Sequence, residues 1–350
     1  MKRKERGERI RRHIVDDVRA HPADLAKHIG ELFGITPQAV NHHVQRLEQE
    51  GWLTSQGIGK GKRYFLGDLR RCDSMFRLDR DVAEDVLWRD HFAYVFEGLA
   101  KNTYDICHFS FTEMVNNVLD HSGGTIVSIS AIREKDALVI IVIDDGEGIF
   151  RKIKRLYDLP DERQALFELS KGKLTTDPEH HSGEGIFFTS RLCDAFVIES
   201  KGVRFCHDAT CAFDVILETG IAEKDVGTAV YMRISRHSAH DIQSVFDEYA
   251  GPDEYQFTKT VIPVRLAQYE NEMLVSRSEA KRLLLRIDRF KHVIFDFDGV
   301  AAVGQAFADE IFRVYARAHP DIVLLPLNMV QPVEKMVKRA IASRSVDAPN

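Results

Sequence analysis

Apolar residues recur at helical spacing in three successive stretches of the first 50 residues. The three apolar stripes are Ile10, Ile14, Val15 and Val18; Leu25, Ile29 and Leu32; and Val40, Val44 and Leu47. Gly34 ends the second predicted helix. Thr36 suits the N-cap of the third, and Pro37 suits its first position, where the missing N–H costs nothing. The pattern predicts three short helices packed on one small core.

The outward face of the third predicted helix is polar, and it carries Gln38, Asn41, His42, Gln45 and Arg46. The stretch "WLTSQGIGKGKRYFL" then predicts a hairpin with Lys60, Lys62 and Arg63 at its tip. Such side chains bond base edges and phosphates. The arrangement resembles a bacterial winged helix-turn-helix, and we expect residues 1–70 to bind DNA; the alternative is a winged helix that contacts only proteins.

Charge along the chain supports this interpretation. Residues 1–70 hold 14 Lys and Arg against 9 Asp and Glu, a net charge of +5, whereas the whole chain of 350 residues has a net charge of −6. A basic head on an acidic body favours nucleic acid as the partner of the head. Residues 71–95 are densely charged with interspersed aromatic residues, which predicts a linker helix.

The length predicts two or three domains. No apolar run approaches the ~20 residues that span a bilayer. The charged N-terminus does not resemble a signal peptide, and five irregularly spaced cysteines do not form a disulfide framework. These features predict a cytoplasmic protein without a membrane partner.

Glu113, Asn117 and His121 follow one another at four-residue spacing in "FTEMVNNVLDHS", so they lie along one face of a predicted helix. The core-facing positions of this helix are Met114, Val115, Val118 and Leu119. A carboxylate, an amide and an imidazole in a row have little reason to be buried together and suit a site. The amide oxygen can bind Mg²⁺, and the carboxylate can orient a water molecule.

Three further segments combine glycines with candidate ligand-binding groups: "ALVIIVIDDGEGI" with Asp144, Gly146 and Gly148; "HHSGEGIFFTSRLCD" with Gly183 and Gly185; and "GTAVYMRI" with Gly227 and Thr228. A carboxylate that ends an apolar strand can accept a hydrogen bond from an amino group such as that of adenine. Glycines let the backbone approach a ligand, and a helix N-terminus can bind phosphate. The Thr228 hydroxyl can reach the same base.

In this order, the four segments resemble the motifs of the GHKL ATPases, the superfamily of gyrase, MutL, histidine kinases and anti-sigma kinases. The resemblance covers about residues 95–235 and implies a Bergerat α/β sandwich over 96–262 that binds ATP and Mg²⁺. It implies that Asn117 binds Mg²⁺, that Asp144 binds adenine and that Glu113 stands at the position of the general base. It also implies a mobile ATP lid over about 150–182, where Lys171 and Lys173 contact phosphate.

In the last segment, 263–350, predicted helices and strands alternate. Its "VIFDFDGVAAVG" resembles the start of an aspartate-nucleophile phosphatase, with Asp296 and Asp298 as nucleophile and acid. That chemistry also needs a Ser or Thr after the next strand and a later acidic pair, and the remaining sequence offers neither. The segment instead resembles the STAS fold of anti-anti-sigma factors. It lacks the phosphorylated serine of that family, since Gly304, Gln305 and Ala306 occupy the corresponding positions.

We therefore expect an α+β multidomain protein with a winged helix, a GHKL domain and a STAS-like domain. The first hypothesis is an ATP-binding bacterial transcriptional regulator that uses binding or slow hydrolysis as a switch. The alternative is a partner-switching serine/threonine kinase that acts on a separate protein, with the STAS-like domain as a further protein-contacting surface. A third hypothesis is structural: nucleotide stabilises the fold and an ATP-driven homodimer without chemistry.

Overall fold

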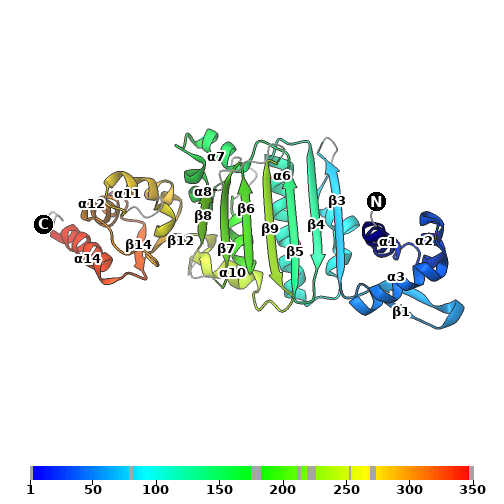
Figure 1. Ribbon diagram of the computed structural model, residues 1–350. Helices are drawn as coiled ribbons and strands as arrows, with labels where there is room; N and C mark the ends of the chain where they lie inside the picture. Colours follow the sequence, from blue (N-terminus) through cyan, green and yellow to red (C-terminus); the bar gives the residue numbers. More distant parts are fainter. Residues whose placement is uncertain are drawn as a thin grey trace.

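The computed structural model describes residues 3–78, 82–174, 183–210, 214–218, 226–251, 254–268 and 273–346. The chain forms three units in sequence order, and the N-terminal and C-terminal units lie at opposite ends of the molecule (Figure 1). We call them the N-terminal unit (residues 3–66), the middle unit (70–257) and the C-terminal unit (259–346). This arrangement is mixed α and β in several sheets, as the sequence predicts.

The N-terminal unit consists of α1 (Arg3–Asp17), α2 (Leu25–Phe33), α3 (Pro37–Glu50), β1 (Leu53–Gln56) and β2 (Arg63–Leu66). The strands β1 and β2 pair antiparallel, with a helical turn at Gly59–Gly61 between them. The Thr36 side chain caps α3 by accepting from the Ala39 N–H (3.3 Å). The predicted stripes form the core of this unit except for Leu32, which is exposed because Phe33 packs against the core in its place.

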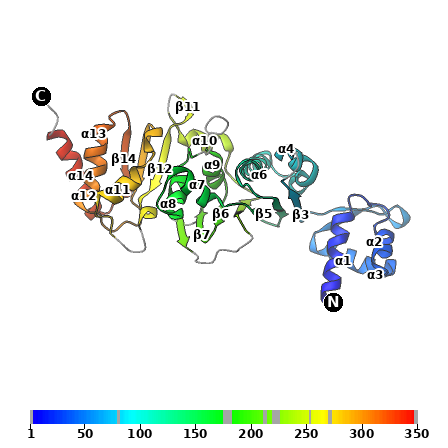
Figure 2. The ribbon, with the colours of Figure 1, turned by 90° about the horizontal axis from the view of Figure 1, so that it is seen from above.

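The middle unit is built on a seven-stranded antiparallel sheet in the order β3-β4-β5-β9-β6-β7-β8. Its strands are β3 (Arg70–Arg77), β4 (Ile126–Arg133), β5 (Ala137–Asp144), β6 (Ala195–Ser200), β7 (Val203–Asp208), β8 (Val215–Glu218) and β9 (Thr228–Ser235). Its main helices are α6 (Lys101–His121), α7 (Ile149–Tyr157), α8 (Glu162–Ser170), α9 (Gly185–Leu192) and α10 (Ile242–Tyr249). The helices α6 and α9 lie on the same face of the sheet (Figure 2). A short pair, β10 (Ala250–Gly251) and β11 (Glu254–Phe257), follows.

The structure differs from the predicted linker helix at 71–95. Residues 70–77 form β3, which pairs with β4 from Arg70 opposite Arg133 to Arg77 opposite Ile126. The dense charges hid a period of two in which Cys72 and Phe76 pack against the core. Helical structure begins only afterwards, with α4 (Glu84–Leu87), a π-helical turn (Trp88–Phe92) and α5 (Ala93–Phe96).

The C-terminal unit is a three-stranded parallel sheet in the order β12-β13-β14 with helices. Its elements are β12 (Lys259–Pro263), a 3₁₀ turn (Val264–Ala267), α11 (Arg277–Leu284), a 3₁₀ turn (Ile287–Arg289), β13 (His292–Asp296), α12 (Gln305–Asp309), a π-helical turn (Glu310–Tyr315), α13 (Ala316–Ala318), β14 (Val323–Leu327) and α14 (Gln331–Val346). Because β12 pairs with β13, this unit begins before the predicted boundary at 263. Ser276 caps α11 in a capping box with Glu279.

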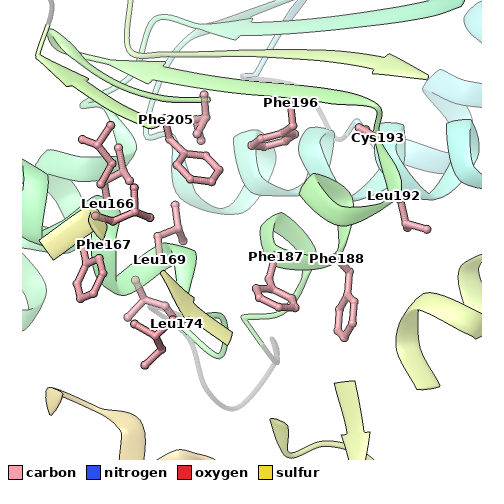
Figure 3. Packing of buried hydrophobic residues seen from close by; sticks show 14 of the residues in the cluster. Leu166, Phe167, Leu169, Leu174, Phe187, Phe188, Leu192, Cys193, Phe196 and Phe205 are labelled. Atoms are coloured by element: carbon pink, nitrogen blue, oxygen red, sulfur yellow. The ribbon is translucent and has the colours of Figure 1, made fainter. Parts of the chain in front are cut away.

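The middle and C-terminal units share one continuous hydrophobic core, whereas the N-terminal unit has a separate one. Figure 3 shows Phe196 and Phe205 directed from the sheet toward the helices, and Phe187 and Phe188 of α9 directed away from the sheet. The ring of Phe257 continues this layer, with its centroid 4.7 Å from Phe187 and 5.4 Å from Phe290 of the C-terminal unit. We therefore expect the middle and C-terminal units to move as one body, and the N-terminal unit to move relative to them.

Candidate functional site

A cavity of about 280 Å³ lies between α6, α7, the start of α9 and the ends of β5 and β9. Seven of the residues singled out from the sequence line it: Glu113, Asn117, His121, Asp144, Gly183, Gly185 and Thr228. They come from four segments spread along more than a hundred residues of chain. The fold therefore brings the separate motifs to one place, together with apolar walls such as Val142, Ile198 and Val230.

Asp144, at the end of β5, is the most buried carboxylate of the cavity, with 4% of its surface exposed. Its Oδ1 accepts a hydrogen bond from the Gly146 N–H (2.8 Å). Burial raises the pKa of Asp144, while hydrogen bonds from Gly146 and Thr228 oppose the rise. The carboxylate is thus held in a fixed orientation at the base of the cavity and has acceptor capacity left for a ligand.

The glycines around Asp144 are required by close packing. A Cβ on Gly146 would overlap the Ser122 carbonyl, and a Cβ on Gly227 would overlap the Asp144 carboxylate. Gly148 has φ +94° and lies against the Ser200 hydroxyl. Gly146 and Gly148 therefore shape the turn behind the cavity without lining it. Glycine is needed at these positions because neighbouring atoms come too close to leave room for a Cβ.

The face of α6 toward the cavity carries Glu113, Asn117 and His121. Met114, Val115 and Val118 of the same helix are buried, and Met114 and Val118 also form part of the cavity wall. The Asn117 Nδ2 is buried and has no hydrogen-bond partner among the described residues. A buried amide atom without a partner costs free energy that a bound ligand can recover. Gly185 must be glycine because a Cβ would overlap the Glu113 carboxylate, which therefore lies against the N-terminus of α9.

These features fit a nucleotide with a bound Mg²⁺ ion. The Asn117 side chain offers an amide oxygen of the kind that binds Mg²⁺, and its unpartnered Nδ2 can donate to a ligand oxygen. The start of α9 borders the cavity at Gly185. No three His, Cys, Asp or Glu side chains in the described ranges gather closely enough to hold a metal ion by themselves. Mg²⁺ commonly combines few protein ligands with substrate phosphates and waters.

Lys152 of α7 is a charged cavity residue that the sequence interpretation missed. Among the lining residues in the described part of the chain, it is the one Lys or Arg. Its Nζ donates to the His121 carbonyl (2.8 Å), and burial lowers its pKa. The segment "FRKIKRL" holds four basic residues. Lys152 could have been singled out from the sequence because it lies on the same face of α7 as the apolar residues Ile149 and Ile153, which point inward.

Lys171 and Lys173, expected as phosphate contacts, do not line the cavity. The Lys171 Nζ is buried 2.7 Å from Glu168 Oε1 and 2.9 Å from the Leu285 carbonyl. The Lys173 Nζ donates to the Arg289 carbonyl (3.2 Å). Both amino groups thus contact the C-terminal unit. Of the expected lid, residues 150–174 form α7, α8 and the turn after α8, and residues 175–182 lie outside the described residues.

The predicted DNA-contacting residues on α3 share one exposed face: Gln38, Asn41, His42, Gln45 and Arg46. Arg46 Nε is 2.7 Å from Glu50 Oε1 on the same helix. In the hairpin Arg63 is exposed, whereas Lys62 lies 3.4 Å from Glu48 and over the Tyr64 ring. The side chain of Lys60 lies outside the described residues. The polar α3 face and Arg63 are therefore the accessible part of the predicted surface.

Asp296, at the end of β13, has a structural environment. Its Oδ1 accepts hydrogen bonds from the Asp298 N–H (3.0 Å) and from Asn328 Nδ2 (2.9 Å). These bonds join the turn after β13 to the end of β14. Asp296 therefore holds the end of its strand in place, which is the structural role that remains when the phosphatase interpretation is set aside.

A family model described as a STAS-like domain of unknown function (DUF4325) matches residues 279–334. The match runs from α11 into α14, so it confirms the prediction of a STAS-like domain in the C-terminal part of the chain. No curated protein matches the chain. Within the described ranges, none of the helices combines the length and the apolar composition that crossing a bilayer requires.

Proposed function

We propose that the protein is an ATP-binding transcriptional regulator, in which the cavity of the middle unit binds Mg·ATP and the N-terminal unit binds DNA. The observation that carries the proposal is the meeting of Glu113, Asn117, Asp144 and Thr228 in one cavity with the glycine-led start of α9. The seven-stranded sheet with helices on one face supports the GHKL-type sandwich that these motifs imply.

Each group has an assigned task in this proposal. The Asp144 carboxylate and the Thr228 hydroxyl hold the adenine edge, because their atoms lie at the buried base of the cavity. The Asn117 amide holds Mg²⁺, and the first N–H groups of α9 bind phosphate. Glu113 lies beside the start of α9 and orients water if ATP is hydrolysed.

The α3 face supports DNA as the partner of the N-terminal unit. Its exposed amide and guanidinium groups are those that read base edges in the major groove. The separate core of this unit lets it reorient without disturbing the cavity. Contacts to the middle unit include Arg12 with Asp73 (3.0 Å) and Arg19 over the Tyr94 ring (4.2 Å).

The proposal is tested by titrating the full-length protein with ATP and with GTP in the presence of Mg²⁺ by calorimetry. Selective ATP binding is expected. DNA binding is then measured at fixed salt with and without ATP, because salt alone shifts affinity strongly. Absence of ATP binding overturns the nucleotide part, and a DNA affinity that ATP leaves unchanged overturns the switch.

Replacing Lys152 with methionine should weaken ATP binding about 10-fold, because a charge-assisted hydrogen bond contributes ~1.5–3 kcal/mol. We assign the Lys152 amino group to the phosphates of ATP, so adenosine binding should change little. Calorimetry with both ligands measures the difference. Lys154→Met is the matched control on the same helix, because Lys154 lies 3.6 Å from Glu162 and does not line the cavity. Equal losses for ATP and adenosine would show that Lys152 acts only through the fold.

Adenosine affinity should fall on acidification, starting above the pH range in which an ordinary aspartate titrates. Burial raises the pKa of Asp144, so its acceptor carboxylate becomes protonated as the pH falls toward that raised value. Adenosine is the probe because it has no phosphate to titrate. Glu113 and His121 line the same cavity, so the Asp144→Asn variant is the control. Any affinity left in that variant should not decline over this pH range.

A further inference from the structure

The chain from Gln164 to Leu174, which we call the α8 segment, lies between the cavity and the C-terminal unit. Leu169 and Leu174 line the cavity. Lys171 and Lys173 instead contact the C-terminal unit. One short segment therefore touches both the candidate nucleotide site and the STAS-like domain.

Side chains of the α8 segment donate hydrogen bonds to main-chain carbonyls of residues 282–290. These bonds are Gln164 Nε2 to the Arg282 carbonyl (3.3 Å), Lys171 Nζ to the Leu285 carbonyl (2.9 Å) and Lys173 Nζ to the Arg289 carbonyl (3.2 Å). In the opposite direction, Arg289 Nη1 donates to the Lys173 carbonyl (2.8 Å), and Thr260 Oγ1 donates to the Lys171 carbonyl (2.8 Å). Because the carbonyls belong to one stretch of backbone, a shift of either partner breaks several bonds together.

A buried ion pair stands at the centre of this contact. Glu168 Oε1 lies 2.7 Å from Lys171 Nζ, and both side chains are at most 2% exposed. Glu168 Oε2 and Arg286 Nη2 are also buried, and neither has a hydrogen-bond partner among the described residues. A buried polar atom without a hydrogen-bond partner lowers stability. Removing one member of a buried ion pair lowers it further, because the other charge is left buried and unpaired. The contact thus has a defined geometry, but two of its buried polar atoms lack hydrogen-bond partners among the described residues.

The cavity is small with the α8 segment in this position. Its volume of about 280 Å³ lies just below the roughly 300–1,000 Å³ typical of ligand pockets. Leu169 and Leu174 form part of its wall. Leu169 and Leu174 are therefore the points at which a nucleotide in the cavity would contact the α8 segment, which is bonded to residues 282–290.

We infer that the docked C-terminal STAS-like domain restrains the α8 segment and thereby opposes nucleotide binding, so that ATP and docking of this domain compete. The inference rests on the proposed function, since it requires a nucleotide in the cavity. Coupling between two binding events is reciprocal. Occupancy by ATP therefore loosens the bonds to residues 282–290 by the same factor by which those bonds weaken ATP binding.

The test uses the full-length double variant Lys173→Met, Arg289→Ala, which removes one donor from each side of the contact and leaves the cavity lining intact. It should bind ATP about 5- to 20-fold more tightly than the wild-type protein, within the usual range of coupling between sites. If Lys173 instead contacted phosphate, the double variant would bind ATP more weakly than the wild-type protein. Lys281→Ala is the matched control, because this exposed lysine faces Glu310 within the C-terminal unit. Its ATP affinity should equal that of the wild type.

Hydrogen exchange of the wild-type protein gives a second measurement that needs no variant. ATP should speed amide exchange in residues 282–290 and leave α14 unchanged. Unchanged ATP affinity in the folded double variant, or slower exchange in 282–290, overturns the inference but leaves the nucleotide site in place. Absence of ATP binding in both the wild type and the double variant overturns the proposed function as well.

Discussion

The Asp144→Asn variant should bind ATP about 100-fold more weakly than the wild-type protein, because an acceptor worth ~1.5–3 kcal/mol is replaced at a buried position. The asparagine carbonyl can keep the hydrogen bond from the Gly146 N–H, which holds the loop. The amide NH₂ then occupies the position of the second carboxylate oxygen, where it meets the amino group of adenine. Two donors face each other, so binding is lost while the fold is retained. Calorimetry with Mg·ATP measures the change.

Asp145→Asn is the matched control for this prediction. The neighbouring carboxylate accepts from the Thr125 N–H (2.7 Å) and the Ile126 N–H (2.9 Å), and it does not line the cavity. We expect lower stability in this variant but ATP affinity within about twofold of the wild type, since no ligand contact is removed. Wild-type ATP affinity in Asp144→Asn, with the fold verified by circular dichroism, would remove Asp144 from the site.

Replacing Asn41 and Gln45 together with alanine should lower affinity for a preferred duplex about 30-fold or more, because each base-edge contact contributes ~1–3 kcal/mol. Both side chains lie on the exposed face of α3, away from its buried stripe. The preferred duplex is obtained by selection from a random pool with the wild-type protein. Binding to unrelated DNA, and its salt dependence, should stay near wild-type values because phosphate contacts are retained.

Two comparisons make the DNA prediction specific. Lys338→Ala, in α14 at the opposite end of the molecule (Figure 1), should leave both affinities unchanged. Arg63→Ala, at the exposed hairpin, should weaken all duplexes alike and reduce the salt slope by about one. If the α3 double variant binds the selected duplex as the wild type does, the α3 face does not read bases. A protein partner would then be the better interpretation.

Local patterns predicted much of the fold correctly. The apolar stripes of the N-terminal unit and the cap at Thr36 follow from side-chain period and capping chemistry, which are short-range. Motif spacing also predicted which residues gather at the cavity, because a four-residue spacing holds one helix face and an apolar strand positions the residue that ends it. What these residues bind remains a prediction.

Long-range packing decided the points at which the sequence interpretation was wrong or silent. Strand β3 was assigned to a helix because its many charges obscured the alternation of inward and outward side chains. That alternation has a consequence only when β3 pairs with β4. The first strand of the C-terminal sheet, β12, was assigned to the preceding domain because its parallel partner, β13, begins some 30 residues later. Neither pairing leaves a signal within a short window of sequence.

The sequence by itself determined the three-part order of the chain, the helices of the N-terminal unit, the STAS-like character of residues 279–334 and seven of the residues that line the cavity. Only the tertiary structure decided where the lysines lie. Lys152 reaches the cavity, and Lys171 is buried against Glu168 and the C-terminal unit. The reason is physical: periodicity sets which side of its own element a residue occupies, whereas the partner on that side is set by segments distant in the chain.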